Sequence, residues 1–180
     1  MAEFKKVSVP DEIEALCEFD RKTFYLHPQD IFEPETWEEC ESYWMIVDGQ
    51  TVGCSAFIHD VDYTEKPRKD CLYILSTGIR PDSQRRGFGN QMKAWQIEYA
   101  KQRGFTRIVT NMRQSNERII RLNQKFGFTV KKIDPHYYAD AEPCVVMELD
   151  LAETYKCPAC GKPLRTPRAK QCRFCHADWH

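Results

Sequence analysis

The chain has 180 residues and a formal net charge of −1, with 42% hydrophobic and 29% charged residues. This length suits one ordinary domain with a small appendage, and the composition excludes disorder. The near-zero net charge excludes a bulk affinity for nucleic acid or membranes. Because no apolar run reaches the roughly 18 residues of a spanning helix and the N-terminus has no signal-peptide pattern, we expect a cytoplasmic protein.

The apolar pattern of the first 69 residues predicts a mixture of strands and helices. We expect a strand over 4–9, helices over 10–24 and 35–42, strands over 43–47 and 51–60, and loops over 25–34 and 64–69. The dipeptide Asp48-Gly49 favours a two-residue hairpin turn between the two adjacent strands.

The rest of the core pattern alternates strands with helices. We expect a strand over 71–79, a helix over 87–103, a strand over 106–112, a helix over 116–126 and strands over 128–133 and 145–151, with a loop over 134–142. Gly104 stands where a helix C-cap glycine is common. The order predicts an α/β fold with a mixed central sheet flanked by helices and one strand–helix–strand crossover.

A glycine-containing turn links the strand over 71–79 to the following helix. Its sequence, Gln84-Arg-Arg-Gly87-Phe-Gly89, lies at a helix N-terminus, where unpaired N–H groups and the helix dipole attract anions. The two glycines let an anion approach the backbone closely. We interpret the turn as a diphosphate cradle. A nucleoside-triphosphate P-loop would need Gly-Lys-Ser/Thr, and a dinucleotide fingerprint would need a glycine where Met92 stands.

This turn resembles the acetyl-CoA motif Gln/Arg-x-x-Gly-x-Gly/Ala of the GCN5-related N-acetyltransferase (GNAT) superfamily. The segment 113–128 is similar to the family's Asn-x-x-Ala-x-x-Leu-Tyr-x-Lys-x-Gly-Phe helix. Within the family, the segments 72–78 and 135–151 look most like the central strand and last hairpin of protein N-terminal acetyltransferases. The resemblance covers roughly residues 4–151 and implies a GNAT-like fold that uses acetyl-CoA.

The resemblance also implies roles for particular residues. Asn116, which suits a helix N-cap as well, would line one side of the cofactor, and the backbone of Ile79 would pair with the pantetheine arm. Tyr137 and Tyr138 would flank the acceptor, unless they only form a half-buried hairpin, and the loop with His27 and Pro28 would close over the acceptor's first residue. The pyrophosphate would be held by Gln84, Arg85, Arg86, Gly87, Phe88, Gly89 and Asn90.

A strong general base is missing from the pattern. Relatives place Glu or His on the second central strand and Tyr on the following helix, where this chain has Asn111 and Asn123. Because a protein α-amine has a pKa of about 8 and a lysine amine about 10.4, a site without a carboxylate suits the α-amine. We expect Tyr73 to relay the proton, unless it is a core aromatic, and Asn123 to contact the cofactor by donating to its thiolate. The reserves for the base are His59, His136 and Glu142.

Four of the nine cysteines form two Cys-x-x-Cys pairs near the C-terminus: Cys157 with Cys160, and Cys172 with Cys175. Two such pairs bind a metal tetrahedrally, and we expect a structural zinc ribbon over 153–180 after an acetyltransferase domain over 1–152. Rubredoxin-type iron uses the same ligands and is the rival metal. A haem attachment site at Cys172–His176 is discounted because no export signal is present. The other cysteines are scattered singly and read as reduced.

The sequence therefore predicts an enzyme that moves the acetyl group of acetyl-CoA to an amine, most plausibly a protein or peptide N-terminus. Two alternatives remain: a small-molecule amine as the acceptor, and a non-catalytic acetyl-CoA-binding module whose ribbon mediates interaction. The ribbon's own partner is either the acetyltransferase domain or, through its basic residues, nucleic acid or the ribosome; no membrane partner is expected.

Overall fold

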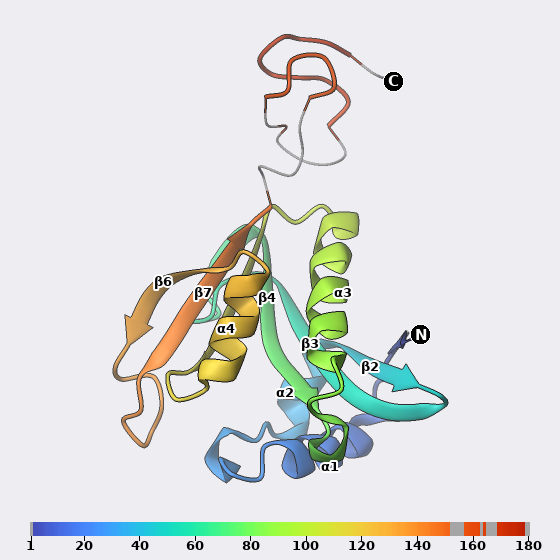
Figure 1. Cartoon of the computed structure of the whole chain (residues 1–180), viewed down its shortest axis with the longest axis vertical. Coiled ribbons are helices and arrows are strands. Elements are labelled where there is room, and N and C mark those ends of the chain that lie inside the picture. The colour runs from blue at the N-terminus through green and yellow to red at the C-terminus, as the bar shows by residue number, and fades with distance from the viewer. Residues whose placement is uncertain (1, 152–156, 163, 165–168, 179–180) are drawn as a thin grey trace.

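The structure is a computed structural model that describes residues 2–151, 157–162, 164 and 169–178 (Figure 1). The N-terminal half contains β1 (Glu3–Lys6), α1 (Ile13–Thr23), the short 3-10 helix η1 (Pro28–Asp30), α2 (Pro34–Glu38), β2 (Glu41–Val47), β3 (Gln50–Val61) and β4 (Pro67–Ile79). The second half contains η2 (Pro81–Ser83), α3 (Phe88–Arg103), β5 (Arg107–Arg113), α4 (Glu117–Lys125), β6 (Thr129–Asp134) and β7 (Cys144–Asp150).

The strands form one sheet in the order β1-β2-β3-β4-β5-β7-β6. Among the strand pairs described, β4 and β5 run parallel and the others antiparallel. A parallel pair needs a crossover, and α3 provides it. The mixed sheet and its strand–helix–strand crossover confirm the predicted fold class.

The parallel pair separates partway along its length. Pairing between β4 and β5 starts at Cys71 with Arg107 and ends at Ile74 with Thr110. Nevertheless, β4 continues to Ile79 on its other edge, where it stays paired with β3. The edge of β4 over 75–79 therefore faces no strand in the described part of the chain. This opening inside the sheet positions the site discussed below.

Alternate residues of β4 belong to two different hydrophobic clusters. Leu72 and Ile74 pack in the cluster that contains Tyr99 of α3, and partly buried residues of α4 pack against it. Cys71 and Tyr73 belong to the other cluster, which Tyr138 joins. The alternation follows from the strand period of two. Figure 1 shows α3 and α4 in front of the sheet and α1 and α2 behind it.

The predicted helix and strand limits differ from the structure by three residues or more at four places, one of which is the first helix, expected over 10–24 and found over Ile13–Thr23. The helix expected over 35–42 ends at Glu38, because residues 41 and 42 already pair with β3. The first strand covers Glu3–Lys6 rather than 4–9. The charged loop expected over 64–69 gives its last three residues to β4, where Pro67 pairs with Val61 and Arg68 forms an ion pair with Glu148. The charged residues indicated a loop, but in the structure they lie on a paired strand where their side chains stay partly exposed.

Two predicted turns are confirmed by their backbone angles. Asp48 and Gly49 have φ of 50° and 74° and join β2 to β3 as a two-residue turn. Gly104 has φ of 83° and caps α3. The predicted domain boundary at 152/153 falls outside the described residues and stays a prediction. In the described part of the chain, no helix combines the length and the apolar character needed to cross a membrane.

Candidate active site and metal centre

The turn over 84–90 presents unpaired backbone donors. Gly87 is the N-cap of α3, with φ of 85°, and no side chain caps the helix. The N–H groups of 85–89 donate no hydrogen bond to any described residue. Unpaired N–H groups at a helix start bind anions. The structure therefore gives the predicted cradle the required geometry, although the cofactor contacts themselves stay a prediction.

Gly87 and Gly89 serve different purposes in this turn. Gly87 lies in the left-handed region, which side-chain-bearing residues avoid. Gly89 lies outside it, and a Cβ there would meet only Leu122 at 3.5 Å, an ordinary contact. The fold alone therefore does not demand glycine at 89. The close approach of a ligand to the backbone at Gly89 stays a prediction.

Two cations from α4 reach the turn, and neither was singled out from the sequence. Arg118 donates to Oε1 of Gln84 at 3.1 Å, and Lys125 donates to Oδ1 of Asn90 at 2.7 Å. Together with the exposed Arg85, they concentrate positive charge around the unpaired donors. Their helical spacing of seven residues on α4 was the signal that could have revealed them.

The neighbouring predicted cofactor residues also lie around this opening. The carbonyl of Ile79 accepts a hydrogen bond from Gln84 Nε2 at 3.1 Å, which fixes the strand end beside the turn. Asn116 is the N-cap of α4 and accepts from Ile119 N at 3.3 Å. Its capping role is thus established, and its contact with the cofactor stays a prediction. Arg86 stacks on Phe88, with 5.2 Å from Cζ to the ring centre.

Tyr73 of β4 and Asn111 of β5 form a polar centre on the sheet face opposite the cluster that contains Tyr99. The Tyr73 hydroxyl donates to Oδ1 of Asn111 at 2.7 Å, and Asn111 Nδ2 lies 3.5 Å from Sγ of Cys144. Tyr73 is 1% exposed. Burial raises its pKa well above the ordinary value, and the neighbouring phenol of Tyr137 raises it further. Tyr73 therefore keeps its proton at neutral pH and cannot act as a strong base.

The two hairpin tyrosines lie beside this centre. The rings of Tyr137 and Tyr138 meet edge to face at 5.0 Å between centres, and Tyr138 packs against the cluster that contains Tyr73. Burial raises the pKa of both phenols. The structure thus brings together Tyr73, Tyr137 and Tyr138. Their contact with an acceptor stays a prediction.

Asn123 lies apart from that centre. It is fully buried on α4, and its Nδ2 lies 3.5 Å from Sδ of Met112 while its Oδ1 has no partner among the described residues. Its donor thus already faces a soft sulfur atom. Donation to a thiolate would require the cofactor to enter between α4 and β5, and that role stays a prediction.

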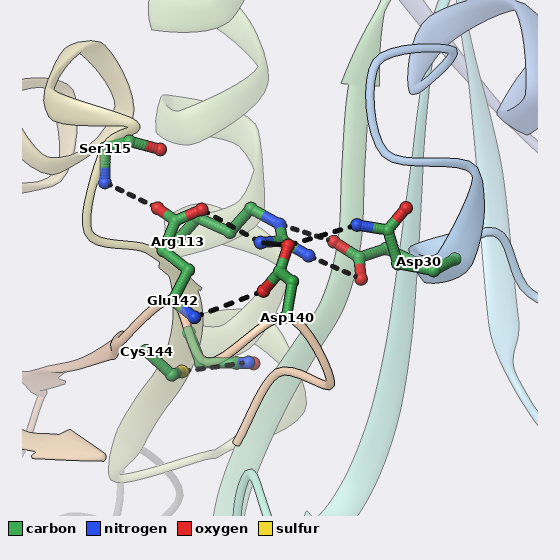
Figure 2. Close-up of polar contacts among 8 residues, drawn as sticks. Asp30, Arg113, Ser115, Asp140, Glu142 and Cys144 are labelled. Atoms are coloured by element: carbon green, nitrogen blue, oxygen red, sulfur yellow. Dashed lines mark hydrogen bonds and ion pairs between the residues drawn. The ribbon is translucent and has the colours of Figure 1, made fainter. Parts of the chain in front are cut away.

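The segment with His27 and Pro28 is held against the loop between β6 and β7. Asp30, at the end of η1, forms an ion pair with Arg113, and Gln29 donates to Asp140 at 3.2 Å. Figure 2 shows the guanidinium of Arg113 between Asp30 and the two acids of the β6–β7 loop. The sequence analysis missed this arginine, which gave no signal because its three partners are distant in the sequence.

Two of the three reserve bases, Glu142 and His59, are poorly suited to the role, and that of His136 stays a prediction. Hydrogen bonds from Ser115, and then from Arg113, hold the pKa of Glu142 at about 2, so this carboxylate binds protons weakly. His59 contacts Tyr99 and Glu41 in a separate polar cluster, and burial lowers its pKa. The backbone N–H of His136 donates to Asp134 on the exposed loop.

The four predicted metal ligands converge. Their sulfur atoms all lie within 4.8 Å of one another. The Sγ atoms of Cys157 and Cys175 are 3.6 Å apart, and those of Cys160 and Cys172 are 3.7 Å apart. Four sulfurs about 2.3 Å from a zinc ion form a tetrahedron with edges of about 3.8 Å. The donor set therefore suits a tetrahedral metal, and two of its sulfur pairs already lie close to that separation.

Two similar knuckles orient these thiolates. Gly161 N bonds to the carbonyl of Cys157, and His176 N bonds to that of Cys172, both at 2.8 Å. Gly161 and His176 both have positive φ, 68° and 57°. The N–H of Cys160 points at Sγ of Cys157 at 3.4 Å. Such N–H groups stabilise thiolates, which are the metal-binding form.

A family model for the acetyltransferase (GNAT) family matches residues 12–128. This match covers both the turn at 84–90 and the separated strands. The chain belongs to the acetyltransferase (GNAT) family. Its activity is accordingly acyl transfer, and the fold and the family resemblance predicted from the sequence are confirmed. A comparison with curated protein sequences finds no match.

Solved structures of this GNAT fold resemble the chain closely in shape and weakly in sequence. The ribosomal-protein-S18-alanine N-acetyltransferase from Escherichia coli has a TM-score of 0.68 at 18% identity, over 84% of this chain and 94% of that one. A Bacillus subtilis acetyltransferase in complex with CoA has 0.66 at 22%, over 84% and 99%. Ard1 from Thermoplasma volcanium has 0.66 at 18%, over 83% and 97%. At these identities the likeness supports the fold alone.

Proposed function

We propose that this acetyltransferase transfers the acetyl group of acetyl-CoA to the α-amine of a protein or peptide N-terminus. The observation that carries the proposal is the hydrogen bond from Tyr73 to Asn111. In the described chain no carboxylate hydrogen-bonds to either residue, so the site holds no strong base there. The acceptor must then arrive as the neutral amine. At pH 7.5 about a third of α-amines are neutral, against about a thousandth of lysine side chains.

The cofactor would lie in the opening between β4 and β5. Acetyl-CoA would supply the acetyl group as a reactive thioester. The N–H groups of 85–89 would bind its pyrophosphate, with Arg118 and Lys125 adding positive charge. The unpaired edge of β4 over 75–79, ending at Ile79, would pair with the amides of the pantetheine arm. The CoA-bound Bacillus subtilis structure with the same fold supports this placement.

The residues of the opposite face would handle the amine. Because the Tyr73 proton is committed to Asn111, the hydroxyl oxygen can accept a hydrogen bond from the incoming amine and orient its lone pair. The proton that the amine loses would go to this oxygen while the hydroxyl turns its own proton away from Asn111 and releases it to water. Tyr137 and Tyr138 would flank an extended acceptor, and the segment with His27 and Pro28 would cover its first residue. The E. coli structure, named for an alanine of a ribosomal protein, supports a protein acceptor.

The metal would be structural. We propose zinc, held by the four cysteines of the C-terminal module. Four thiolates complete a tetrahedron and leave no open position for a substrate, so the ion would stabilise the small module rather than take part in the transfer. Rubredoxin-type iron remains the rival occupant.

The function is tested by acetylating two matched peptides that each contain one lysine, one with a free and one with a blocked N-terminus. With acetyl-CoA, mass spectrometry should find the label on the α-amine of the free peptide and little on either lysine. Preferential labelling of the blocked peptide's lysine would refute the α-amine assignment. No transfer to either peptide or to a panel of small amines, together with intact acetyl-CoA binding, would indicate a non-catalytic module.

A further inference from the structure

Arg113 connects two segments that are far apart in the sequence and belong to the proposed acceptor side of the site. It is the last residue of β5 and is 6% exposed. Its Nε and Nη2 donate to the two carboxylate oxygens of Asp30 at 2.6 and 2.9 Å. Its Nη1 donates to Asp140 and to Glu142, both at 2.8 Å. The guanidinium is thus shared between η1 and the β6–β7 loop (Figure 2).

The charges explain why this one arginine matters to both segments. Three carboxylates meet there, and Arg113 is the only cation that forms an ion pair with any of them in the described part of the chain. The pKa of Arg113 is raised chiefly by its hydrogen bonds to Asp30. The pKa of Asp140 is lowered first by the Glu142 N–H and that of Glu142 first by Ser115, and Arg113 lowers both further. Without the guanidinium, three like charges would repel one another and drive the two segments apart.

The same guanidinium also fixes a side chain of the site. Its Cζ lies 4.1 Å from the ring centre of Tyr138, a stacking distance for a cation over an aromatic face. Tyr138 packs against the cluster that contains Tyr73. Arg113 therefore holds the covering segment and a flanking tyrosine in one arrangement. The turn at 84–90, which lies on the proposed cofactor side, is held instead by polar contacts with α4.

We propose that Arg113 is a positioning residue that preassembles the acceptor-binding surface by clamping η1 to the β6–β7 loop. It touches neither the thioester nor the amine, and it acts by removing the ordering cost that a flexible surface would impose on acceptor binding. The inference rests on the proposed function, because the acceptor is assigned to this face there. To the proposed function, this inference adds that the affinity for the acceptor depends on Arg113.

The test compares Asp30→Asn, Arg113→Lys and Arg113→Gln with the matched control Arg68→Gln, which breaks the ion pair with Glu148 away from the site. We expect the acceptor KM to rise at least tenfold in Arg113→Gln, less in Arg113→Lys, which keeps the charge, and severalfold in Asp30→Asn. The kcat should stay within about threefold and the acetyl-CoA Kd within about twofold. Arg68→Gln should leave all three values unchanged.

Hydrogen exchange of the free protein provides a readout that needs no acceptor. In Arg113→Gln, exchange should become faster in both 24–33 and 134–143, and 84–90 should be unaffected. If Arg113→Gln does not fold, Asp30→Asn carries the same test, because Asp30 is partly exposed at the end of η1. A fall in kcat with unchanged acceptor KM, a parallel loss of acetyl-CoA affinity, or unchanged exchange would each overturn the proposal. If the acceptor proves not to be an α-amine, the exchange result still decides the role of Arg113.

Discussion

Tyr73 and Asn111 face each other across the parallel strands β4 and β5, with 2.7 Å between the hydroxyl oxygen and Oδ1. The amide of Asn111 cannot take up a proton, so this contact orients the tyrosine without turning it into a base. The rate of transfer should therefore follow the acceptor's own ionisation and rise with pH toward about 8.

Replacement of the hydroxyl tests that contact. Tyr73→Phe should lower turnover ten- to a hundredfold, because the amine loses the oxygen that orients it, while acetyl-CoA affinity changes little. Steady-state kinetics and calorimetry measure the two effects. Tyr43→Phe, which removes a hydroxyl bonded to Glu41, is the control and should keep full turnover. An unaffected Tyr73→Phe enzyme would make this tyrosine a packing residue only.

The turn at 84–90 can be tested by adding a side chain at Gly89. Gly89→Val should weaken acetyl-CoA binding at least tenfold, or about 1.4 kcal/mol, because the new methyl groups would occupy the space of a phosphate. The fold should survive, since a Cβ at 89 meets only Leu122 at an ordinary distance. Ala94→Val, exposed on the same helix, is the matched control. Equal calorimetric affinity in the folded Gly89→Val protein would rule out the cradle.

The cysteine module should carry one metal ion per chain. Elemental analysis of the purified protein should find one zinc, and the four thiols of the module should resist titration until a chelator removes the metal. Cys172→Ser should lower the metal content, whereas Cys17→Ser, at a buried cysteine of α1, should not. One iron ion per chain instead of one zinc would change the identity of the metal but not the assignment of its four ligands. Four freely titrating thiols in the native protein would disprove the site.

Truncation after Ala152, at the predicted domain boundary, asks whether the core depends on the module, because it keeps Leu151, which is buried in the core cluster. Because no cysteine of the module belongs to the turn at 84–90 or to the Tyr73 centre, the shortened chain should bind acetyl-CoA with an unchanged Kd. Circular dichroism should show a cooperative thermal transition for the truncated chain. A shortened chain that fails to fold would make the module a structural part of the core.

Asp20 should make stability depend on pH. This carboxyl group is 1% exposed, accepts the Phe32 N–H at 3.1 Å, and has its pKa raised by burial to about 6. Since the folded-state pKa lies above the unfolded value, the folded chain binds this proton more tightly. The wild type should lose stability as pH rises from about 4 to 6.

Asp20→Asn keeps the acceptor for Phe32 and cannot ionise, so it should exceed the wild type at pH 7 by about 1–3 kcal/mol and approach it at pH 4. Urea unfolding at several pH values measures the difference. Glu14→Gln, exposed on the same helix, should show no such pH-dependent gap. A constant difference at every pH would assign the effect to packing instead of ionisation.

Local chemistry made the element order, the glycine turn and the cysteine ligands predictable from the sequence. Asp48-Gly49 requires positive φ angles, and the Cys-x-x-Cys spacing brings both thiols of each pair to one metal. The Arg113 network was not predictable, because Asp30 lies 83 residues away and only the fold unites them. The spacing of Arg118 and Lys125 places them on one face of a helix, but only the fold brings that face to the turn at 84–90. The predicted end of α2 was wrong because residues 41 and 42, which fit the helical pattern, pair with β3 instead.

The early separation of β4 from β5 has a consequence for the unliganded protein. Over 75–79 this edge of β4 faces no strand in the described part of the chain, so its backbone groups that Gln84 does not reach are left to water. A ligand carrying its own amides can replace that water as an additional strand would. The resting enzyme is in this sense an incomplete sheet, and its melting temperature should rise with acetyl-CoA concentration as the missing pairing is filled.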